Sequence, residues 1–320
     1  MAEHYFVTGG AGFIASNLID RLLADGHQVT AYDNLTTGFR RFLDEANQNS
    51  NFQFVEGNLL DRERLTAAMK DANFVAHLAA NADVRFGTHH PHKDLEQNTI
   101  ATFNVLEAMR ANSVKRIAFA STGAIYGDHR TIPTPEDAPF PIQTSLYGAS
   151  KLAGEGLIQA YCEGFGFQGW IFRFVSILGA RYTHGHIFDF YSKLLANPSE
   201  LHVLGNGEQR KSYMVVSDCV SAITTAIAKA DSKVNILNLG TDSSCNIKQS
   251  IGWICARLNL TPKVIFAGGE RGWIGDSPLV HLDTTRIRNL GWEPQYTIQQ
   301  GVERTVDWLT ANRWAFEQRS

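Results

Sequence analysis

Short apolar runs alternate with amphipathic stretches through the first half of the chain. Five runs have the length and composition of buried strands, at residues 5–7, 28–32, 52–55, 74–77 and 116–120. Helical spacing follows the first run to about Leu23, covers 95–111, and returns from Tyr147 to about Gly164, ahead of a further apolar run at 170–174. Because parallel strands are joined by helical crossovers of one hand, the alternation predicts an α/β fold with a doubly wound, Rossmann-type parallel sheet.

The pattern changes after residue 174. Residues 176–212 and 262–282 are richer in Gly, Pro and His, while 235–239 has the character of a strand that returns to the first sheet. We therefore expect a dinucleotide-binding domain over 1–174, completed by a returning segment near 213–240. The remainder of 175–320 is expected to form mainly a smaller, discontinuous C-terminal substrate-binding lobe.

Composition narrows the classes of protein that fit. The chain has 320 residues, of which 44% are hydrophobic and 19% charged, and its net charge is −3. Because the chain has no excess of basic residues, neither nucleic acid nor an anionic membrane is expected as a partner. No targeting segment or bilayer-length apolar run is found, so we expect a cytoplasmic protein. The four cysteines lack metal-site spacing, so no metal is expected, and isolated thiols fit a reducing compartment.

A glycine-rich segment joins the first strand to the first helix. Residues 8–15 read TGGAGFIA, at the place where a dinucleotide fingerprint belongs. Gly9 permits the tight turn, and Gly12 lets a pyrophosphate approach the backbone and the helix N-terminus. Phe13 and Ile14 begin that helix and are included in the candidate site. A turn of this kind can also be purely structural, so its context matters.

Residues at the ends of the next strands extend the candidate cofactor site. Asp33 ends the second strand 24 residues after Gly9, where a carboxylate can accept hydrogen bonds from ribose hydroxyls. An acid there repels a 2′-phosphate, which favours NAD over NADP. The ends of the third and fourth strands add Asn58, Leu59, Leu78, Ala79 and Ala80. His77, just before them, is interpreted as a packing histidine.

Tyr147 and Lys151 stand four residues apart at the start of a helical stretch, so both side chains lie on one helix face. A neighbouring ammonium favours the phenolate and lowers a tyrosine pKa from about 10 toward the working pH. Tyr147 is therefore a candidate general acid or base. Ser121 and Thr122 end the fifth strand, where a hydroxyl would face the nicotinamide and the Tyr147 helix.

Together these segments resemble the extended short-chain dehydrogenase/reductase family, and within it the NAD-dependent nucleotide-sugar epimerases and dehydratases. The resemblance covers nearly the whole chain and rests on 8–15, Asp33-Asn34, 77–80, Asn98, Ser121-Thr122, Tyr126-Gly127, Tyr147/Lys151 and 290–294. It implies NAD as the cofactor, with Asn34 and Asn98 beside it. It also implies that Thr122 hydrogen-bonds the reacting sugar hydroxyl, Tyr147 removes its proton and Lys151 binds the nicotinamide ribose.

The two residues after Thr122 bear on the reaction. Dehydratases of this family resemble one another in having Asp-Glu there, which protonate the leaving hydroxyl and take the C5 proton. This chain has Gly123 and Ala124 instead. Loss of water is therefore disfavoured, and epimerisation at C4 through a transient 4-keto sugar fits best. The alternatives are epimerisation at another carbon, reduction of a keto sugar, dehydration, and a non-catalytic NAD-binding regulator.

The expected substrate-binding positions depart from the family pattern. Ser176 stands where the family usually has Asn, and Lys211 where it usually has Arg, with Arg210 one residue earlier. We expect Arg210 or Lys211, or both, to meet the diphosphate of a nucleoside-diphosphate sugar, because phosphate requires cationic partners. Arg271 could reach the second phosphate, but the alignment of its loop with the family motif is left open.

Three further residues are candidates for the substrate site. Asn81 and Arg85 follow the cofactor loop and could face the sugar, and His186 could contact the sugar or nucleotide, unless it belongs to a solvated loop. The resemblance also suggests a homodimer, formed through the helices around 95–111 and 147–164.

Overall fold

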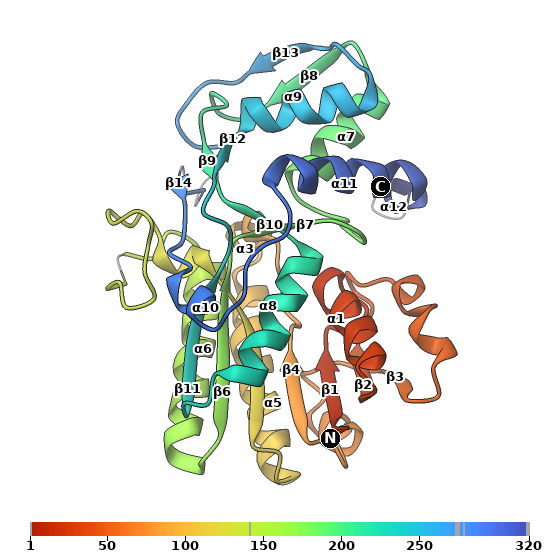
Figure 1. Cartoon of the computed structure of the whole chain (residues 1–320), viewed down its shortest axis with the longest axis vertical. Helices are drawn as coiled ribbons and strands as arrows, with labels where there is room; N and C mark the ends of the chain where they lie inside the picture. Colours follow the sequence, from red (N-terminus) through yellow and green to blue (C-terminus); the bar gives the residue numbers. More distant parts are fainter. Residues whose placement is uncertain (1, 141, 273–275, 278, 318–320) are drawn as a thin grey trace.

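Seven parallel strands form the central sheet, in the order β11-β6-β5-β4-β1-β2-β3 (Figure 1). Their bounds are β1 (His4–Thr8), β2 (Gln28–Asp33), β3 (Phe52–Glu56), β4 (Phe74–His77), β5 (Arg116–Thr122), β6 (Gln168–Phe174) and β11 (Val234–Leu239). The computed structural model describes residues 2–140, 142–272, 276–277 and 279–317, and of residues 84–86 it describes only the backbone. The order 3-2-1-4-5-6 of the first six strands is that of the dinucleotide-binding fold, which confirms the predicted fold class.

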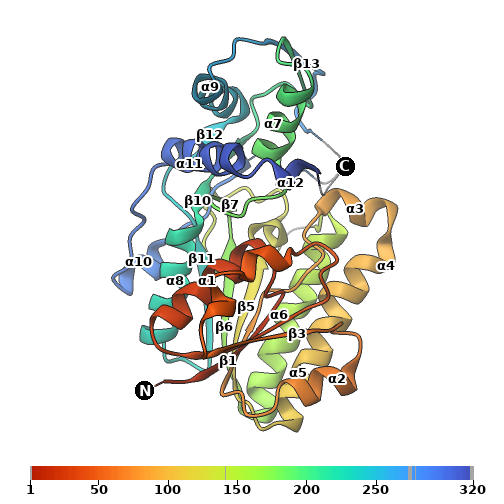
Figure 2. The same cartoon turned by 90° about the vertical axis from the view of Figure 1, so that its right-hand side faces the viewer.

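Helices cover both faces of this sheet (Figure 2). One face carries α1 (Phe13–Ala24) and α8 (Val216–Lys229), and the other carries α2 (Arg62–Ala68), α5 (Ala101–Ala111) and α6 (Leu146–Phe165). Phe6 and Val7 of β1 are both fully buried and belong to different core clusters, because successive side chains of a strand point to opposite faces. A sheet buried on both sides explains why its strands read as continuous apolar runs.

One predicted helix begins differently from the expectation, and the predicted returning strand is present. The helix predicted over 95–111 begins as a π-helical segment, η3 (Leu95–Ile100), before α5. The strand expected to return does so, since β11 pairs in parallel with β6 at the edge of the sheet. The exact division of the chain into domains at residue 174 remains a prediction.

The second lobe lies above the carboxyl ends of the strands in Figure 1. Its longer helices are α7 (His186–Ala196), α9 (Ile247–Leu258) and α11 (Ile298–Ala311). Its strands form three small sheets, which pair β7 (Ser176–Leu178) with β10 (Tyr213–Val215), β8 (Glu200–Val203) with β13 (Lys263–Phe266), and β9 (Arg210–Lys211) with β12 (Cys245–Asn246) and β14 (Leu279–Val280).

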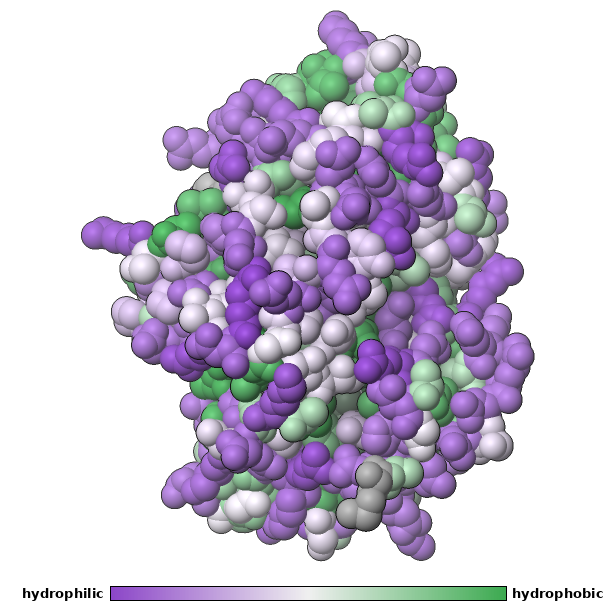
Figure 3. Space-filling view, in the orientation of Figure 1, coloured by the Kyte–Doolittle hydropathy of each residue, from purple (hydrophilic) through white to green (hydrophobic). Residues whose placement is uncertain are grey.

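Short helical segments complete the fold: η1 (Arg40–Leu43), η2 (Ala46–Gln48), α3 (Val84–His89), α4 (Pro91–Asp94), η4 (Gly123–Tyr126), α10 (Thr285–Asn289) and α12 (Trp314–Glu317). Within the described part of the chain, no helix is both long and apolar enough to cross a membrane. Figure 3 shows that the face viewed in Figure 1 is mostly hydrophilic, with hydrophobic residues in small groups. The strand order reverses between β1 and β4, and ligands of doubly wound folds bind outside the carboxyl ends of strands at such a point.

Candidate active site

The turn after β1 leaves the N-terminus of α1 open to a ligand. Gly9 has φ +68°, and a Cβ there would lie 2.8 Å from the Cα of Ala79, so a side chain would collide with the loop after β4. Gly12 is the N-cap residue of α1, where no side chain of the described residues caps the helix and no acidic residue occupies the first turn. The backbone N–H groups at the start of α1, near Phe13 and Ile14, therefore fit the pyrophosphate of a dinucleotide.

Asp33 lies beside this turn. It is 9% exposed, its Oδ2 accepts a hydrogen bond from the Ala11 backbone N–H at 3.0 Å, and its Oδ1 accepts one from the Leu35 N–H at 2.7 Å. Burial raises the pKa of this carboxyl, and the two backbone hydrogen bonds oppose that rise. A carboxylate has about four lone-pair sites, so acceptor capacity is left for ribose hydroxyls. The residues present thus fit the adenosine half of NAD.

The remaining residues predicted at this edge shape the loops around it. The side chain of Asn34 accepts a hydrogen bond from the Thr36 N–H at 3.1 Å, and that of Asn58 accepts one from the Leu60 N–H at 3.0 Å. Leu59 is 7% exposed and packs in the core. Asn34 and Asn58 therefore fix turns at the ends of β2 and β3, next to the expected ribose position.

The segment after β4 is tied to the end of β1. His77 is fully buried, with Nδ1 2.7 Å from the Thr8 hydroxyl and Nε2 3.0 Å from the Thr102 hydroxyl. Burial lowers its pKa to about 3, with Lys151 acting in the same direction, so the ring is neutral and serves packing, as expected. Ala79 donates its N–H to the Thr8 hydroxyl at 3.3 Å, which holds the 78–80 segment over the glycine-rich turn.

A buried polar cluster connects the loop after β4 to α6. Asn98 is 1% exposed, accepts a hydrogen bond from the Asn81 N–H at 2.8 Å, and donates to the Ser150 hydroxyl at 2.9 Å. Asp94, also 1% exposed, accepts from the Asn81 side chain at 2.8 Å. The Ser150 hydroxyl in turn donates to the carbonyl of Tyr147 at 2.8 Å. Asn98 and Asn81 thus lie together beside the Tyr147 helix, and Asp94 is a member that sequence reasoning missed.

The predicted catalytic side chains meet at the carboxyl end of β5. The Thr122 side chain lies beside the Tyr147 phenol and favours its ionised form. Thr122 Oγ1 also accepts from the Ala124 N–H at 3.1 Å, which caps η4. Lys151 is 2% exposed and donates from Nζ to the carbonyl oxygen of Ala120 at 2.8 Å. The structure therefore brings Thr122, Tyr147 and Lys151 to one place.

The electrostatics of this group differ from the sequence-based expectation. We expected Lys151 to lower the pKa of Tyr147, but burial raises that pKa to about 12, and the opposing contribution comes from the Thr122 side chain. Burial also lowers the pKa of Lys151 to about 7, against the attraction of Glu155 and Asp94. The expectation was wrong because it considered only the charge of the neighbouring ammonium, whereas desolvation dominates for both side chains.

Ser121 has a partner that the sequence analysis did not single out. It is 2% exposed, and its hydroxyl donates a hydrogen bond to Glu155 of α6. Glu155 stands four residues after Lys151, so its place on the same helix face was readable from spacing alone.

The cationic residues predicted for the diphosphate come from two segments of the second lobe, strand β9 for Lys211 and the loop after β13 for Arg271. Lys211 forms an ion pair of 2.6 Å with Asp276, whose side chain is 2% exposed. Arg271 pairs with Asp128 and also donates to the Asp276 carbonyl at 2.6 Å. Lys211 and Arg271 therefore converge on Asp276, an arrangement that the uncertain register of the sequence pattern did not reveal.

The other predicted substrate residues are more dispersed. Arg210 is exposed and donates to the Ser244 carbonyl at 3.2 Å, and Ser176 is an exposed residue at the start of β7. His186 Nε2 lies 2.8 Å from the Ser250 hydroxyl, and burial lowers the pKa of His186 to about 3. The Arg85 side chain falls outside the described residues.

The fold and this edge of the sheet define an α/β enzyme that binds a dinucleotide. The chain belongs to the NAD dependent epimerase/dehydratase family, whose model matches residues 5–240. It is therefore an NAD-dependent enzyme of the extended short-chain dehydrogenase/reductase class, as the motifs indicated.

Relatives with more than one reaction resemble it. The UDP-glucose 4-epimerase of Mycolicibacterium smegmatis is 30% identical, over 95% of this chain and 97% of that protein. A solved structure of the Thermus thermophilus UDP-glucose 4-epimerase, in complex with NAD, superposes with a TM-score of 0.85 at 30% identity, covering 96% of this chain and 99% of that one. The UDP-glucuronic acid decarboxylase 1 of Xenopus tropicalis is 27% identical, over 96% of this chain and 72% of that protein.

Proposed function

We propose that this enzyme epimerises a nucleoside-diphosphate sugar at C4. The observation that carries the proposal is the group of Thr122, Tyr147 and Lys151 at the carboxyl end of β5. The two residues that follow Thr122 in the sequence are Gly123 and Ala124. Neither of these two residues has a side chain that can donate or accept a proton. A pair placed to move one proton out and back suits oxidation and reduction at a single carbon.

The proposed mechanism assigns one task to each side chain. Thr122 orients the C4 hydroxyl of the sugar, and Tyr147 takes its proton while passing its own to the neutral amine of Lys151; both transfers are later reversed. Lys151 fixes the end of β5 through the Ala120 carbonyl and supplies a second proton-holding group in the same buried site. Bound NAD supplies a hydride acceptor and donor. The 4-keto sugar would then have to present its other face before the hydride returns to C4 and the proton to its oxygen.

The substrate class follows from the cations of the second lobe. Lys211 and Arg271 lie around Asp276, and an incoming diphosphate would compete with Asp128 and Asp276 for them. Arginine can hold a phosphate with two parallel hydrogen bonds, whereas lysine acts as a point charge. The similarity to UDP-glucose 4-epimerases supports a UDP-sugar as the first candidate.

We further propose a homodimer that forms through η3, α5 and α6. Leu95, Ile100 and Phe103 are 49%, 40% and 39% exposed along this surface, and a second copy would cover them.

The four cysteines are free thiols, which suits the reducing cytoplasm predicted from the sequence.

The reaction is tested by a screen of UDP-, GDP-, CDP- and dTDP-sugars, with the configuration at each carbon followed by NMR. Inversion at C4 alone supports the proposal. A pentose product, a 6-deoxy-4-keto product, or inversion only at another carbon would replace it with decarboxylation, dehydration or a different epimerisation.

A further inference from the structure

One face of α6 contacts each of the last three residues of β5. The helix residues are Tyr147, Lys151 and Glu155, each four positions after the previous one. Their β5 partners are Thr122 for Tyr147, the Ala120 carbonyl for Lys151, and the Ser121 hydroxyl for Glu155. Glu155 therefore extends the catalytic face of the helix by one turn.

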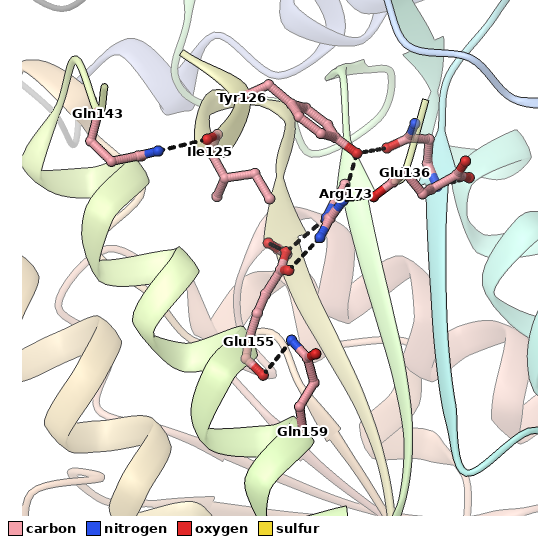
Figure 4. Close-up of polar contacts among 9 residues, drawn as sticks. Ile125, Tyr126, Glu136, Gln143, Glu155, Gln159 and Arg173 are labelled. Carbon is pink, nitrogen blue, oxygen red and sulfur yellow. Dashed lines mark hydrogen bonds and ion pairs between the residues drawn. The ribbon is translucent and has the colours of Figure 1, made fainter. Parts of the chain in front are cut away.

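Arg173 of β6 holds the Glu155 carboxylate from the other side (Figure 4). Its Nε and Nη2 donate to the two carboxylate oxygens at 3.1 and 2.8 Å. Its Nη1 donates to the Tyr126 hydroxyl at 2.6 Å and to the Glu136 carbonyl at 2.8 Å, and Tyr126 donates onward to Asn238 at 2.9 Å. The Arg173 guanidinium thus connects to the end of β5 through Glu155, to the loop after η4 directly, and to β11 through Tyr126.

Stability alone does not account for this ion pair. The side chains of Arg173 and Glu155 are 2% and 0% exposed. Burying two charges carries a desolvation cost, and well-packed apolar residues of similar volume often serve stability as well or better. A buried pair next to the reacting groups therefore calls for a second role.

We propose that Glu155 is a positioning residue of the reaction, which fixes Ser121 and thereby Thr122, and which supplies a fixed anion one helical turn after Lys151. The proposal rests on the proposed hydride-transfer function. Arg173 is its support, because the two-pronged ion pair leaves the carboxylate a single orientation.

The charges around Lys151 agree with this role. Glu155 contributes most to keeping the lysine protonated, and Asp94 from α4 acts in the same sense. His77 of β4 faces the lysine as a neutral ring, and Tyr147 on the same helix remains a neutral phenol. Loss of the Glu155 charge should therefore lower the pKa of Lys151 further, because the ammonium loses an attractive partner.

The test is Glu155→Gln, with Glu163→Gln as its matched control. Glu163 lies on the same helix and also forms an ion pair, with Lys233 at 2.8 Å, but its side chain is 81% exposed. In Glu155→Gln we expect the rate of reduction of bound NAD by the sugar to fall on the order of 10²-fold, with little change in the sugar KM. The low-pH limb of that rate should move to lower pH. Glu163→Gln should match the wild type in both.

A double variant, Glu155→Leu/Arg173→Met, separates positioning from folding. We expect its thermal midpoint to lie near that of the wild type while hydride transfer stays slow. If the double variant recovers the rate of hydride transfer as well as the thermal midpoint, the ion pair is only structural. A wild-type rate and pH profile in Glu155→Gln would show the same. An ultraviolet difference titration of Tyr147, referenced to Tyr147→Phe, provides a readout that does not depend on turnover. If Glu155 positions the reacting groups, the Tyr147 phenol ionises at a different pH in Glu155→Gln. An unchanged titration overturns the proposal. Absence of hydride transfer in the wild type with every sugar would refute the proposed function instead.

Discussion

The Lys151 ammonium donates its hydrogen bond to the carbonyl oxygen of Ala120, 2.8 Å away, and lies over the Phe119 ring at 4.7 Å. The lysine is thus tied to the end of β5, while Tyr147 lies beside Thr122. Lys151 is buried and Tyr147 is half-buried on the same helix face, so their protons have to be considered together.

The first prediction concerns pH. With the pKa of Lys151 at about 7 and that of Tyr147 at about 12, the pair holds two protons below neutrality and one between these values. Only the one-proton state can accept the sugar proton, so kcat should rise through about pH 7 and then level off. Initial rates from about pH 5.5 to 9.5 test this. A flat profile, or activity that falls as pH rises through 7, would contradict it.

The second prediction concerns the phenol. Tyr147→Phe should reduce turnover by roughly 10²- to 10⁴-fold, the usual contribution of a positioned proton-transfer group, while bound NAD is retained. Tyr161→Phe is the control, since Tyr161 lies on the same helix and donates to Glu107 at 2.8 Å, away from β5. The comparison requires turnover and the amount of nucleotide released on denaturation. Undiminished turnover in Tyr147→Phe would remove this residue from the mechanism.

The third prediction distinguishes two tasks of Thr122. Thr122→Ser keeps the hydroxyl that lies beside Tyr147 and caps η4, whereas Thr122→Val loses the hydroxyl and with it both interactions at nearly constant volume. We expect Ser to retain most activity and Val to lose on the order of 10²-fold in kcat, with about 1 kcal/mol of stability lost with the cap. Steady-state rates and urea midpoints measure the two effects. Equal activity in the two variants would show that the hydroxyl has no chemical task.

The fourth prediction concerns stability at low pH. His77 has a pKa of about 3 in the folded chain against 6.5 for an ordinary histidine, so below pH 6.5 the unfolded chain binds a proton that the folded chain rejects. Its contribution to stability is fully present above about pH 6.5 and is lost as pH falls toward 3, at roughly 1.4 kcal/mol per unit. Urea unfolding of wild type and His77→Gln at several pH values should show a shallower slope in the variant. Parallel slopes would rule this out.

Much of the fold and part of the site could be predicted because their signals are local. The apolar runs gave the strands, and the glycine-rich turn followed β1 as expected. The i, i+4 spacing of Tyr147 and Lys151 placed both on α6, and Thr122 lies opposite them.

Features that depend on distant partners could not be predicted in this way. Arg173 meets Glu155 only because β6 lies beside β5 under α6, and Lys211 meets Asp276 across 65 residues of sequence. The shifted pKa values of Tyr147 and Lys151 were missed for the same reason, since the extent of burial is set by tertiary packing.

Inversion at C4 without other bond changes can be measured by running the reaction in D₂O with a UDP-sugar that carries deuterium or protium at C4. For a 4-epimerase with resident NAD we expect a product inverted only at C4 that keeps its original C4 hydrogen isotope, gains no solvent deuterium at carbon, and needs no added NADH. Solvent deuterium at C3 or C5, loss of carbon dioxide or water, or stoichiometric consumption of NADH would contradict it.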